Sequence, residues 1–219
     1  MSQTFLDQLW IARHVILNGI AMTVSISLLA ILAGSVLGVF VGLALVYGNG
    51  LLRLIVRAYT DVIRGTPVLV LVLASYYVSS AVGIELGPFA AGVLALAIFC
   101  SSHVGEIVRG ALQAIPKGQT EAAKAIGLTF TQTFTSVLWP QALRQCLPAW
   151  VNTAAEMVKA STLLSVIGVA ELLLRTQEII SRNFMSLQFY FLAGALYFVV
   201  NFGIERFGKF VERKTALPS

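Results

Sequence analysis

The sequence predicts an all-α membrane protein with about five transmembrane helices and one structured polar loop. Of its 219 residues, 58% are hydrophobic and only 11% are charged, whereas about 25% of the residues in a soluble domain carry a charge. Four long stretches contain no charged residue, and each is close to the ~20 residues that cross a bilayer, or longer. They lie between residues 13 and 53, 64 and 85, 85 and 106, and 182 and 205. Little chain remains outside them, so we expect residues 1–219 to form a single transmembrane domain.

Hydropathy and the gaps between charges place the spans. In chain order they are at about residues 17–47, 59–81, 89–108, 147–169 and 187–207. The first is longer than one crossing needs, so we expect it to tilt or to extend beyond the bilayer. In the second, the proline of Gly65-Thr66-Pro67 would bend or begin a helix because it lacks an N–H. Glu156 and Lys159 interrupt the fourth, so hydropathy alone predicts it weakly.

The first predicted span also carries a stripe of small residues spaced four apart. These residues are Ala30, Gly34, Gly38 and Gly42. Small residues at this spacing line one face of a helix and let a second backbone approach closely. We therefore expect this helix to press tightly against a neighbour.

Basic residues predict the direction of the spans, because the cytoplasmic connections of membrane proteins are enriched in Lys and Arg. Eleven of the 15 Lys and Arg residues flank the connection after the first span, the third span or the fifth span. These are Arg53, Arg57, Arg64, Arg109, Lys117, Lys124, Arg144, Arg206, Lys209, Arg213 and Lys214. We expect an odd number of spans, with the amino end outside and the carboxyl end in the cytoplasm. The same asymmetry accounts for the net charge of +5, so no nucleic-acid partner is needed to explain it.

The loop at about residues 113–140 has the composition of a helix, a turn and a second helix. Pro116 suits a helix start, and the stretch from Thr120 to Ile126 is rich in Ala, Glu and Lys, which favour helices. Gly127 can adopt the left-handed conformation that ends a helix. We therefore expect a short helix that stops at this glycine.

A second helical segment is expected after the glycine. Thr129 and Gln132 have the spacing of a capping box, and Pro140 is expected to close the segment. The small side chains of Ala122 and Ala123 would then lie at the tip of the loop, where they let a helix sit in a groove on a partner. These residues alone leave two interpretations open, a docking element and an ordinary amphipathic surface loop.

The loop resembles the signature of the permease subunits of ATP-binding-cassette (ABC) importers. The family pattern is Glu-Ala-Ala, three residues, Gly, nine residues, Ile, one residue, Leu-Pro. The residues that match at this spacing are Glu121, Ala122, Ala123, Gly127 and Pro140. Val137 stands in the place of the Ile. Trp139 stands in the place of the Leu, a larger departure that alters packing near the end of the loop.

More of the chain is similar to the polar-amino-acid branch of these permeases, the histidine/glutamine/arginine-type family. The matching segments are Arg64-Gly65-Thr66-Pro67, Glu106 to Ala111, Ile115 to Gln119, Pro140 to Leu143, Leu147-Pro148, Ser165 to Val169 and Glu171-Leu172. The resemblance runs from about Asn18 to Arg213. It implies a multi-pass permease of the bacterial inner membrane that carries a polar amino acid and is itself no enzyme.

The resemblance also implies partners. Members of the family pair with a second permease subunit, identical or different, and two cytoplasmic ATPase subunits receive the coupling loops in surface grooves. A periplasmic or extracellular solute-binding protein delivers the substrate. The residues implied to contact the ATPase are Glu121, Ala122, Ala123, Lys124, Gly127 and Pro140. This sequence has no G-x-x-x-x-G-K-[ST] phosphate loop, so ATP and Mg²⁺ are expected on the partner, with no cofactor or metal in this chain.

Ionisable residues inside predicted spans are candidates for substrate contacts, because charges are costly within a bilayer. The candidates are His103, Glu106, Glu156, Lys159, Ser161 and Thr162. Lys159 would bind the carboxylate of an amino acid, and Glu106 or Glu156 would bind its ammonium group. The alternatives are an internal ion pair between Glu156 and Lys159, a structural pair of Glu106 with Arg109, and a hydrogen-bonded core role for His103.

The chain departs from the family pattern in the fourth span. Relatives usually carry Lys-Asp-Thr-Ser-Leu where this chain has Lys159 to Leu163 with alanine at position 160. Ala160 removes a carboxylate that would pair with a cationic substrate side chain. We hypothesise that the substrate is not a basic amino acid, or that this subunit is the non-binding half of a heterodimer. An uptake preference for arginine or glutamine that is unchanged by Ala160→Asp would count against the first explanation.

Three other functions stay open. A permease for another small solute, such as an opine or an osmolyte, would be separated by an uptake screen. An intramembrane enzyme needs a nucleophile with a base, or metal ligands, at bilayer depth, but the only histidines are His14 and His103. A self-sufficient channel would conduct ions without ATPase subunits and would have no need of a docking loop.

Overall fold

In the computed structural model, which describes residues 4–215, every regular element is helical. The α-helices are α1 (Phe5–Tyr47), α2 (Gly50–Gly65), α3 (Val68–Ala81), α4 (Pro88–Ala114), α5 (Lys117–Ala125), α6 (Phe130–Thr133), α7 (Trp139–Ala160), α8 (Leu172–Asn183) and α9 (Ser186–Thr215). A π-helical turn, η1 (Phe134–Leu138), precedes α7, and a 3₁₀ helix, η2 (Ser161–Ile167), follows it. Three helices (α1, α4 and α9) are long and apolar enough to cross a membrane, and two bent pairs bring the number to five if each pair counts as one span.

The first helix begins at Phe5, much earlier than the predicted start at about residue 17. Thr4 caps it, and its hydroxyl accepts a hydrogen bond from the Asp7 backbone N–H while the Asp7 carboxylate accepts one from the Thr4 backbone N–H. This capping box satisfies the exposed amides of the first turn and lets the helix continue through Arg13 and His14. The helix has 43 residues and is roughly 65 Å long at 1.5 Å per residue. It therefore exceeds the thickness of one bilayer core.

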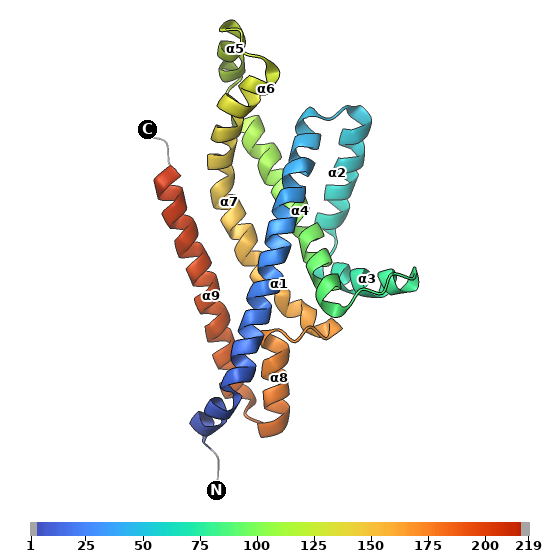
Figure 1. The fold of residues 1–219 in the computed structure, drawn as a ribbon, viewed down its shortest axis with the longest axis vertical. Helices are drawn as coiled ribbons and strands as arrows, with labels where there is room; N and C mark the ends of the chain where they lie inside the picture. Colours follow the sequence, from blue (N-terminus) through green and yellow to red (C-terminus); the bar gives the residue numbers. More distant parts are fainter. Residues whose placement is uncertain (1–3, 216–219) are drawn as a thin grey trace.

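The predicted small-residue stripe packs α1 against α4, the most extensive helix contact in the fold (Figure 1). A Cβ atom placed on Gly34 would lie 2.5 Å from the Cβ of Cys100, and one on Gly38 would lie 2.5 Å from the Cβ of Val104. On Gly42 it would lie 2.7 Å from the Cβ of Val108. No side chain fits at these positions, so the glycines are required for the close approach of the two backbones.

The second predicted span, residues 59–81, is not one straight helix. It is divided between α2 and α3, which meet at an angle of 108°. Thr66 has an extended backbone (φ −97°, ψ 131°), as expected for a residue before proline. Pro67 has no N–H for the helical ladder, so α2 ends at Gly65 and a new helix begins at Val68. The proline was expected to bend or begin a helix, but the length of the amphipathic helix before it was not predicted.

The third and fifth predicted spans correspond to α4 and α9, and each helix extends several residues beyond its predicted end. The fourth, residues 147–169, covers the second half of α7 and η2. One expectation about this region is wrong. Pro140 does not close a helical segment, because it lies in the first turn of α7 and helical backbone continues from Phe130 through η2.

The π-helical turn explains how the chain tolerates Pro140. The Trp139 N–H donates to the carbonyl of Phe134, five residues back. This wider turn changes the backbone register just before the proline, whose ring would otherwise clash with the carbonyl four residues earlier. The side-chain amide of Gln141 then donates to the Val137 carbonyl at 2.8 Å. The second helix of the loop, α6, therefore leads into α7 without a break.

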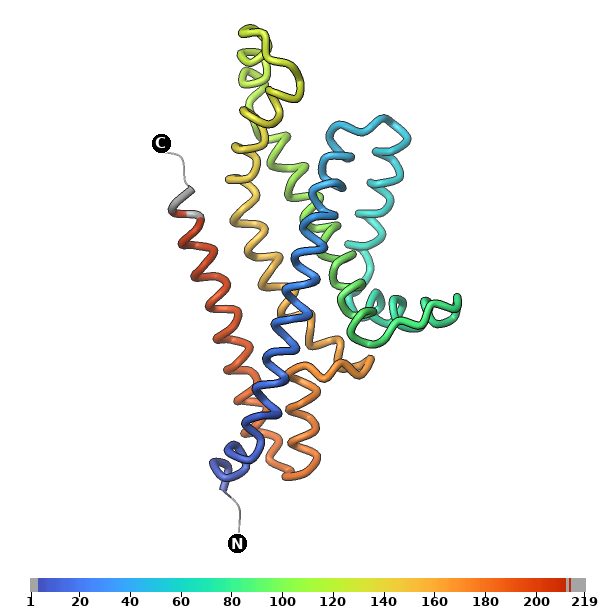
Figure 2. The backbone as a smooth tube through the Cα atoms, viewed as in Figure 1, coloured from blue at the N-terminus to red at the C-terminus, as the bar shows by residue number. Residues whose placement is uncertain are grey.

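The remaining helices close the bundle around α1 and α4. The α7 helix packs on α4, α9 packs along α7, and α8 contacts both α1 and α9 at the end of the bundle where α1 begins. Figure 2 shows that α5 and α6 project beyond the other helices at the opposite end, and that the carboxyl-terminal part of α9 points toward this end. The beginning of α1 and the end of α9 therefore lie at opposite ends of the bundle.

Candidate functional site

The projecting loop has the local geometry that its residues predict. α5 ends at Ala125, and Gly127 has a φ of 82°, a left-handed conformation that glycine adopts without steric cost. The N–H of Gly127 donates to the Lys124 carbonyl at 2.9 Å, and the N–H of Leu128 donates to the Ala123 carbonyl at 3.0 Å. Thr129 then caps α6 in a capping box with Gln132. The chain reverses within four residues between the two helices of the loop.

The two small residues of the loop, Ala122 and Ala123, differ in burial. Ala123 is buried, whereas Glu121, Ala122 and Lys124 are exposed. Ile126 is also exposed, with 77% of its surface accessible. Phe130, the first residue of α6, is 64% exposed, so the loop carries a second exposed apolar side chain.

Aromatic side chains attach the loop to the end of α1. The ring of Tyr47, the last residue of α1, lies edge-on to Phe130 and Phe134 at centroid distances of 5.3 and 5.9 Å. Phe134 in turn stacks on Trp139 at 5.7 Å. Such pairs add to the burial energy of the rings and favour a definite relative orientation. The loop therefore has a fixed position relative to α1 as well as to α7.

The sequence-predicted substrate residue Glu106 is an ion-paired residue in the structure. Its Oε1 accepts a hydrogen bond from Arg57 Nη1 at 2.9 Å, and its Oε2 accepts from Arg109 Nε at 2.9 Å and Nη2 at 2.6 Å. Arg57 lies on α2, so the carboxylate joins α2 to α4 and has both oxygens occupied. The structural pairing with Arg109, which was the alternative interpretation, is present, and Arg57 is an additional partner that the sequence did not indicate.

His103 and the two hydroxyl residues after α7 are also engaged with the backbone. His103 Nδ1 lies 3.0 Å from the carbonyl oxygen of Phe99, and the imidazole lies against the Phe99 ring at 4.4 Å. Ser161 is buried, and its hydroxyl donates to the Val158 carbonyl at 2.8 Å. The Thr162 hydroxyl donates to the Lys159 carbonyl at 2.7 Å. These polar groups therefore have partners before any substrate arrives.

Glu156 and Lys159 differ from the other candidates because both side chains are exposed and neither forms an ion pair within the described part of the chain. The alternative of an internal pair between them is therefore not realised. Lys159 faces a groove between α7 and α9 that also contains Asn201 and Glu205. Of the predicted candidates, these two retain charge that is available to another molecule.

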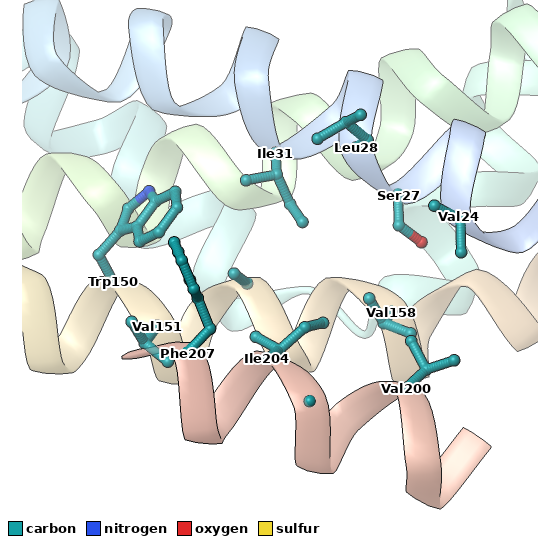
Figure 3. A pocket seen from close by; sticks show the side chains of 12 residues that line it. Val24, Ser27, Leu28, Ile31, Trp150, Val151, Val158, Val200, Ile204 and Phe207 are labelled. Atoms are coloured by element: carbon teal, nitrogen blue, oxygen red, sulfur yellow. The ribbon is translucent and has the colours of Figure 1, made fainter. Parts of the chain in front are cut away.

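A larger cavity lies between α1, α7 and α9, but its chemistry is apolar. It has a volume of about 410 Å³, and Figure 3 shows Trp150, Ile204 and Phe207 among the side chains that surround it. The only polar side-chain groups in its wall are the Trp150 indole N–H, which donates to the Ser35 hydroxyl at 2.8 Å, and the hydroxyl of Ser27. A polar solute would lose its hydration in this cavity without gaining hydrogen-bond partners. The cavity is therefore unsuited to the passage of a polar solute.

Glu171 was not a predicted candidate, although its carboxylate is the most deeply buried acidic group among the described residues. The side chain caps α8 by accepting from the N–H groups of Leu173 and Leu174 at 3.0 and 2.8 Å, and it also accepts from the Tyr197 hydroxyl on α9. Thr23 on α1 accepts from the N–H of Leu172 at 3.1 Å. A carboxylate at this position suits a helix N-terminus, but no helix was predicted at residues 172–183, and the contact with Tyr197 depends on the tertiary fold.

Comparison with known proteins assigns the fold and the loop to a family. The family described as binding-protein-dependent transport system inner membrane component matches residues 34–217. The chain belongs to this family, and it is a membrane-spanning permease subunit of an ABC transporter, in which a partner ATPase hydrolyses ATP.

Individual relatives agree with this class. The chain is 32% identical to the probable amino-acid ABC transporter permease protein YckA of Bacillus subtilis (strain 168), covering 92% of this chain and 89% of the relative. It is 33% identical to the glutamine transport system permease protein GlnP of Escherichia coli (strain K12), covering 94% and 95%. A crystal structure of an amino acid ABC transporter with histidines superimposes with a TM-score of 0.89 at 34% identity, covering 98% of this chain and all of the other. The MetNI methionine ABC transporter, at 22% identity and a TM-score of 0.79, shares the fold over 93% of this chain and 97% of its own.

Proposed function

We propose that this chain is the permease subunit of an importer that carries a polar amino acid across a bacterial inner membrane. A soluble binding protein would deliver the amino acid from outside, and two ATPase subunits would bind ATP and Mg²⁺ on the cytoplasmic side. A second permease subunit, identical or different, would complete the pathway. The relatives whose names refer to glutamine, cystine and arginine transport support an amino acid rather than an opine or an osmolyte.

The observation that carries the proposal is the helix-turn-helix loop that projects from an apolar bundle. Its exposed residues combine small, charged and apolar side chains at one tip, namely Glu121, Ala122, Lys124 and Ile126. Ala123 packs beneath them, Gly127 makes the turn, and Pro140 lies where the loop joins α7. A rigid loop of this kind suits the transmission of ATPase movement to the membrane helices, because its position is fixed against both α1 and α7.

The arrangement of charges supports the proposed orientation. The loop and the carboxyl-terminal half of α9, which together contain much of the Lys and Arg, lie at the same end of the bundle, and the amino terminus lies at the other (Figure 1). By the positive-inside rule, the end that holds the loop would face the cytoplasm. Binding-protein contact would then take place at the opposite end, near α8.

The substrate is proposed from the relatives and from the residues at the end of α7. Lys159 and Glu156 are the predicted candidates with charges that no other described residue neutralises. Ala160 beside them provides no carboxylate for a cationic side chain, so we favour a neutral polar amino acid over a basic one. The Ala160→Asp comparison of arginine and glutamine uptake described above tests this preference.

The docking role of the loop is tested by Ala122→Trp in the complex purified with its own ATPase and reconstituted in vesicles. The side chain of Ala122 is exposed, so the variant should fold and keep its melting temperature. The indole would block close seating of α5, and we expect the uptake of labelled amino acid to fall about tenfold or more, equivalent to about 1.4 kcal/mol of lost contact energy. Co-purification of the ATPase should weaken in parallel.

The matched control is Ala90→Trp, which places the same bulk at an exposed position near the start of α4, far along the helix from the loop. It should leave ATPase retention unchanged. Normal uptake by Ala122→Trp, or equal losses in both variants, would show that the loop does not dock on the ATPase.

A further inference from the structure

The apolar cavity between α1, α7 and α9 has a chemistry that solute transport does not use. Its volume is about 410 Å³, and Figure 3 shows that Ile31 of α1, Val158 of α7 and Ile204 of α9 surround the same space. Apolar cavities of about 150 Å³ in other proteins stay dry and take up hydrocarbon molecules. Water and polar solutes therefore fit this cavity poorly, whereas a hydrocarbon group fits it well.

The cavity opens onto the outside of the bundle. Three of its wall residues are also exposed at the surface, Val24 to 44%, Leu28 to 52% and Phe207 to 66%. An occupant can therefore enter from the side, out of the surrounding bilayer, without passing through the centre of the protein.

The cavity and the polar groove of Lys159 lie on different faces of α9. The groove is lined by Asn201 and Glu205, the cavity by Ile204 and Phe207, and no described residue lines both. If the amino acid passes near Lys159, as the proposed function has it, the groove faces the pathway. The cavity then faces away from the pathway, toward lipid.

The cavity lies in the cytoplasmic half of the membrane domain. On α9 its wall extends from Val200 to Phe207, which is roughly 10 Å at 1.5 Å per residue. The basic residues Arg206, Lys209 and Arg213 begin where this wall ends, and such residues mark the cytoplasmic side. The choice of leaflet rests on the proposed orientation, whereas the cavity itself does not.

The distance from the deep end of the cavity to Arg144 matches the thickness of one leaflet. Val151 lines the cavity, and Arg144 precedes it by two helical turns, so the two side chains share a face of α7. From Val158 to Arg144 is roughly 21 Å along α7, and one leaflet with its headgroup region is about 20–22 Å thick. Arg144 is exposed and forms no ion pair with another described residue. A phospholipid whose chain ends near Val158 would therefore have its phosphate near Arg144.

We propose that this cavity binds one acyl chain of an anionic phospholipid of the cytoplasmic leaflet, and that Arg144 binds the phosphate of that lipid. The chain supplies the close contacts that a packed interior requires, and it joins α1 to α9 on the side away from the pathway. Basic residues at the cytoplasmic surface attract anionic lipids. The competing occupant is a helix of a second permease subunit.

The test uses phosphatidylglycerol with a photoactivatable diazirine at the end of one acyl chain. The full permease–ATPase complex is reconstituted with this probe in phosphatidylethanolamine vesicles and irradiated, and the labelled peptides are identified by mass spectrometry. In the wild type we expect label on the segments of α1, α7 and α9 that line the cavity.

Gly203→Phe fills the cavity from its wall. Gly203 lines the cavity, and a Cβ at this position would meet no atom within 4 Å, so the ring has room without displacing the helices. Labelling of the cavity segments should fall about tenfold or more, and the smaller Gly203→Leu should reduce it less. The matched control is Gly110→Phe in α4, where a Cβ also meets no atom within 4 Å but no cavity wall is involved. It should label as the wild type does.

Arg144→Gln tests the phosphate contact. It should lower the preference of the cavity for the phosphatidylglycerol probe over a matching phosphatidylethanolamine probe by about fivefold, the effect expected of one basic residue on an anionic lipid. The control Arg182→Gln removes an exposed cation from the other end of the bundle and should change this preference by less than about twofold.

Three results would overturn the proposal. The first is a wild type that is labelled only outside the cavity segments. The second is labelling of these segments that both Gly203 variants leave unchanged, or that Gly110→Phe reduces equally. The third is an Arg144→Gln effect no larger than that of Arg182→Gln. Loss of the permease dimer in size-exclusion chromatography of Gly203→Leu, without cavity label in the wild type, would assign the cavity to the second subunit. The readout needs no transport, so a failure of the proposed amino-acid cargo would appear separately, in the uptake assays.

Discussion

At the scale of single residues, Gly38 determines how closely α1 can approach α4. A Cβ at this position would lie 2.5 Å from the Cβ of Val104 and 3.0 Å from the Ser101 carbonyl oxygen. Gly38→Val would therefore force the two backbones apart, and we expect a loss of about 1–3 kcal/mol of stability, which is typical of overpacking. Thermal melting of the purified complex, followed by size-exclusion chromatography, measures this loss.

The control for this prediction is Gly110→Ala in α4. A Cβ on Gly110 would meet no atom within 4 Å, and alanine favours a helix by roughly 1 kcal/mol over glycine. This variant should melt at the same temperature as the wild type or above it. If Gly38→Val were equally stable, the close approach of α1 and α4 would not be a requirement of the fold.

Residues whose partners are distant in sequence were the hardest to assign. Glu106 was a predicted substrate ligand because a carboxylate in a span needs an explanation, and its pairing with Arg109 three residues later was an available alternative. Its other partner, Arg57, is 49 positions away, and no local pattern connects the two. Conversely, the glycine stripe was predicted correctly as a packing face, because its spacing depends only on the geometry of one helix.

At the scale of secondary-structure elements, the π-helical turn before Pro140 sets the rotation of the loop relative to α7. One additional residue in a helical turn rotates the preceding part of the helix by about 100° about the helix axis. Pro140→Ala would supply the missing N–H and allow η1 to become regular α-helix, which removes this rotation. We expect unchanged or higher thermal stability, because proline inside a helix costs up to about 3 kcal/mol, together with a marked fall in uptake per ATP hydrolysed.

Pro148 offers a matched comparison, since it also lies inside α7 but follows the join with the loop. Pro148→Ala should leave the orientation of the loop, and hence the ratio of uptake to ATP hydrolysis, close to that of the wild type. Simultaneous assays of uptake and phosphate release measure this ratio. Equal ratios in wild type and Pro140→Ala would show that the register of the π-turn has no part in coupling.

The loop was predictable because its signals are local. The left-handed Gly127 and the capping box of Thr129 and Gln132 act within one or two turns, and both are present in the structure. The continuation through Pro140 was not predictable in the same way. It depends on a π-helical turn and on the stacking of Phe134 on Trp139, and a helix-ending proline and a tolerated one have the same sequence signal.

At the scale of the whole molecule, the bundle leaves large apolar surfaces uncovered. Leu28 and Phe40 on α1, and Phe191 and Phe198 on α9, are all more than half exposed. Such surfaces are normal where lipid or a second permease subunit covers them. The polar groove of Lys159 and Glu205 interrupts this apolar exterior on one side. The face that carries it is therefore the side that we expect to face the pathway rather than lipid.

An odd number of crossings places the two ends of the chain on opposite sides of the membrane, and this prediction can be tested directly. Ser181 on α8 and Gln119 on α5 are exposed near opposite ends of the bundle. We expect a membrane-impermeant maleimide to label Ser181→Cys in right-side-out vesicles and Gln119→Cys only in inverted ones. The wild type is the control, because Cys100 and Cys146 are buried and should react in neither preparation.

Labelling of both variants from one side would contradict an odd number of spans. Labelling of each from the side opposite to that expected would reverse the orientation and remove the loop from reach of a cytoplasmic ATPase.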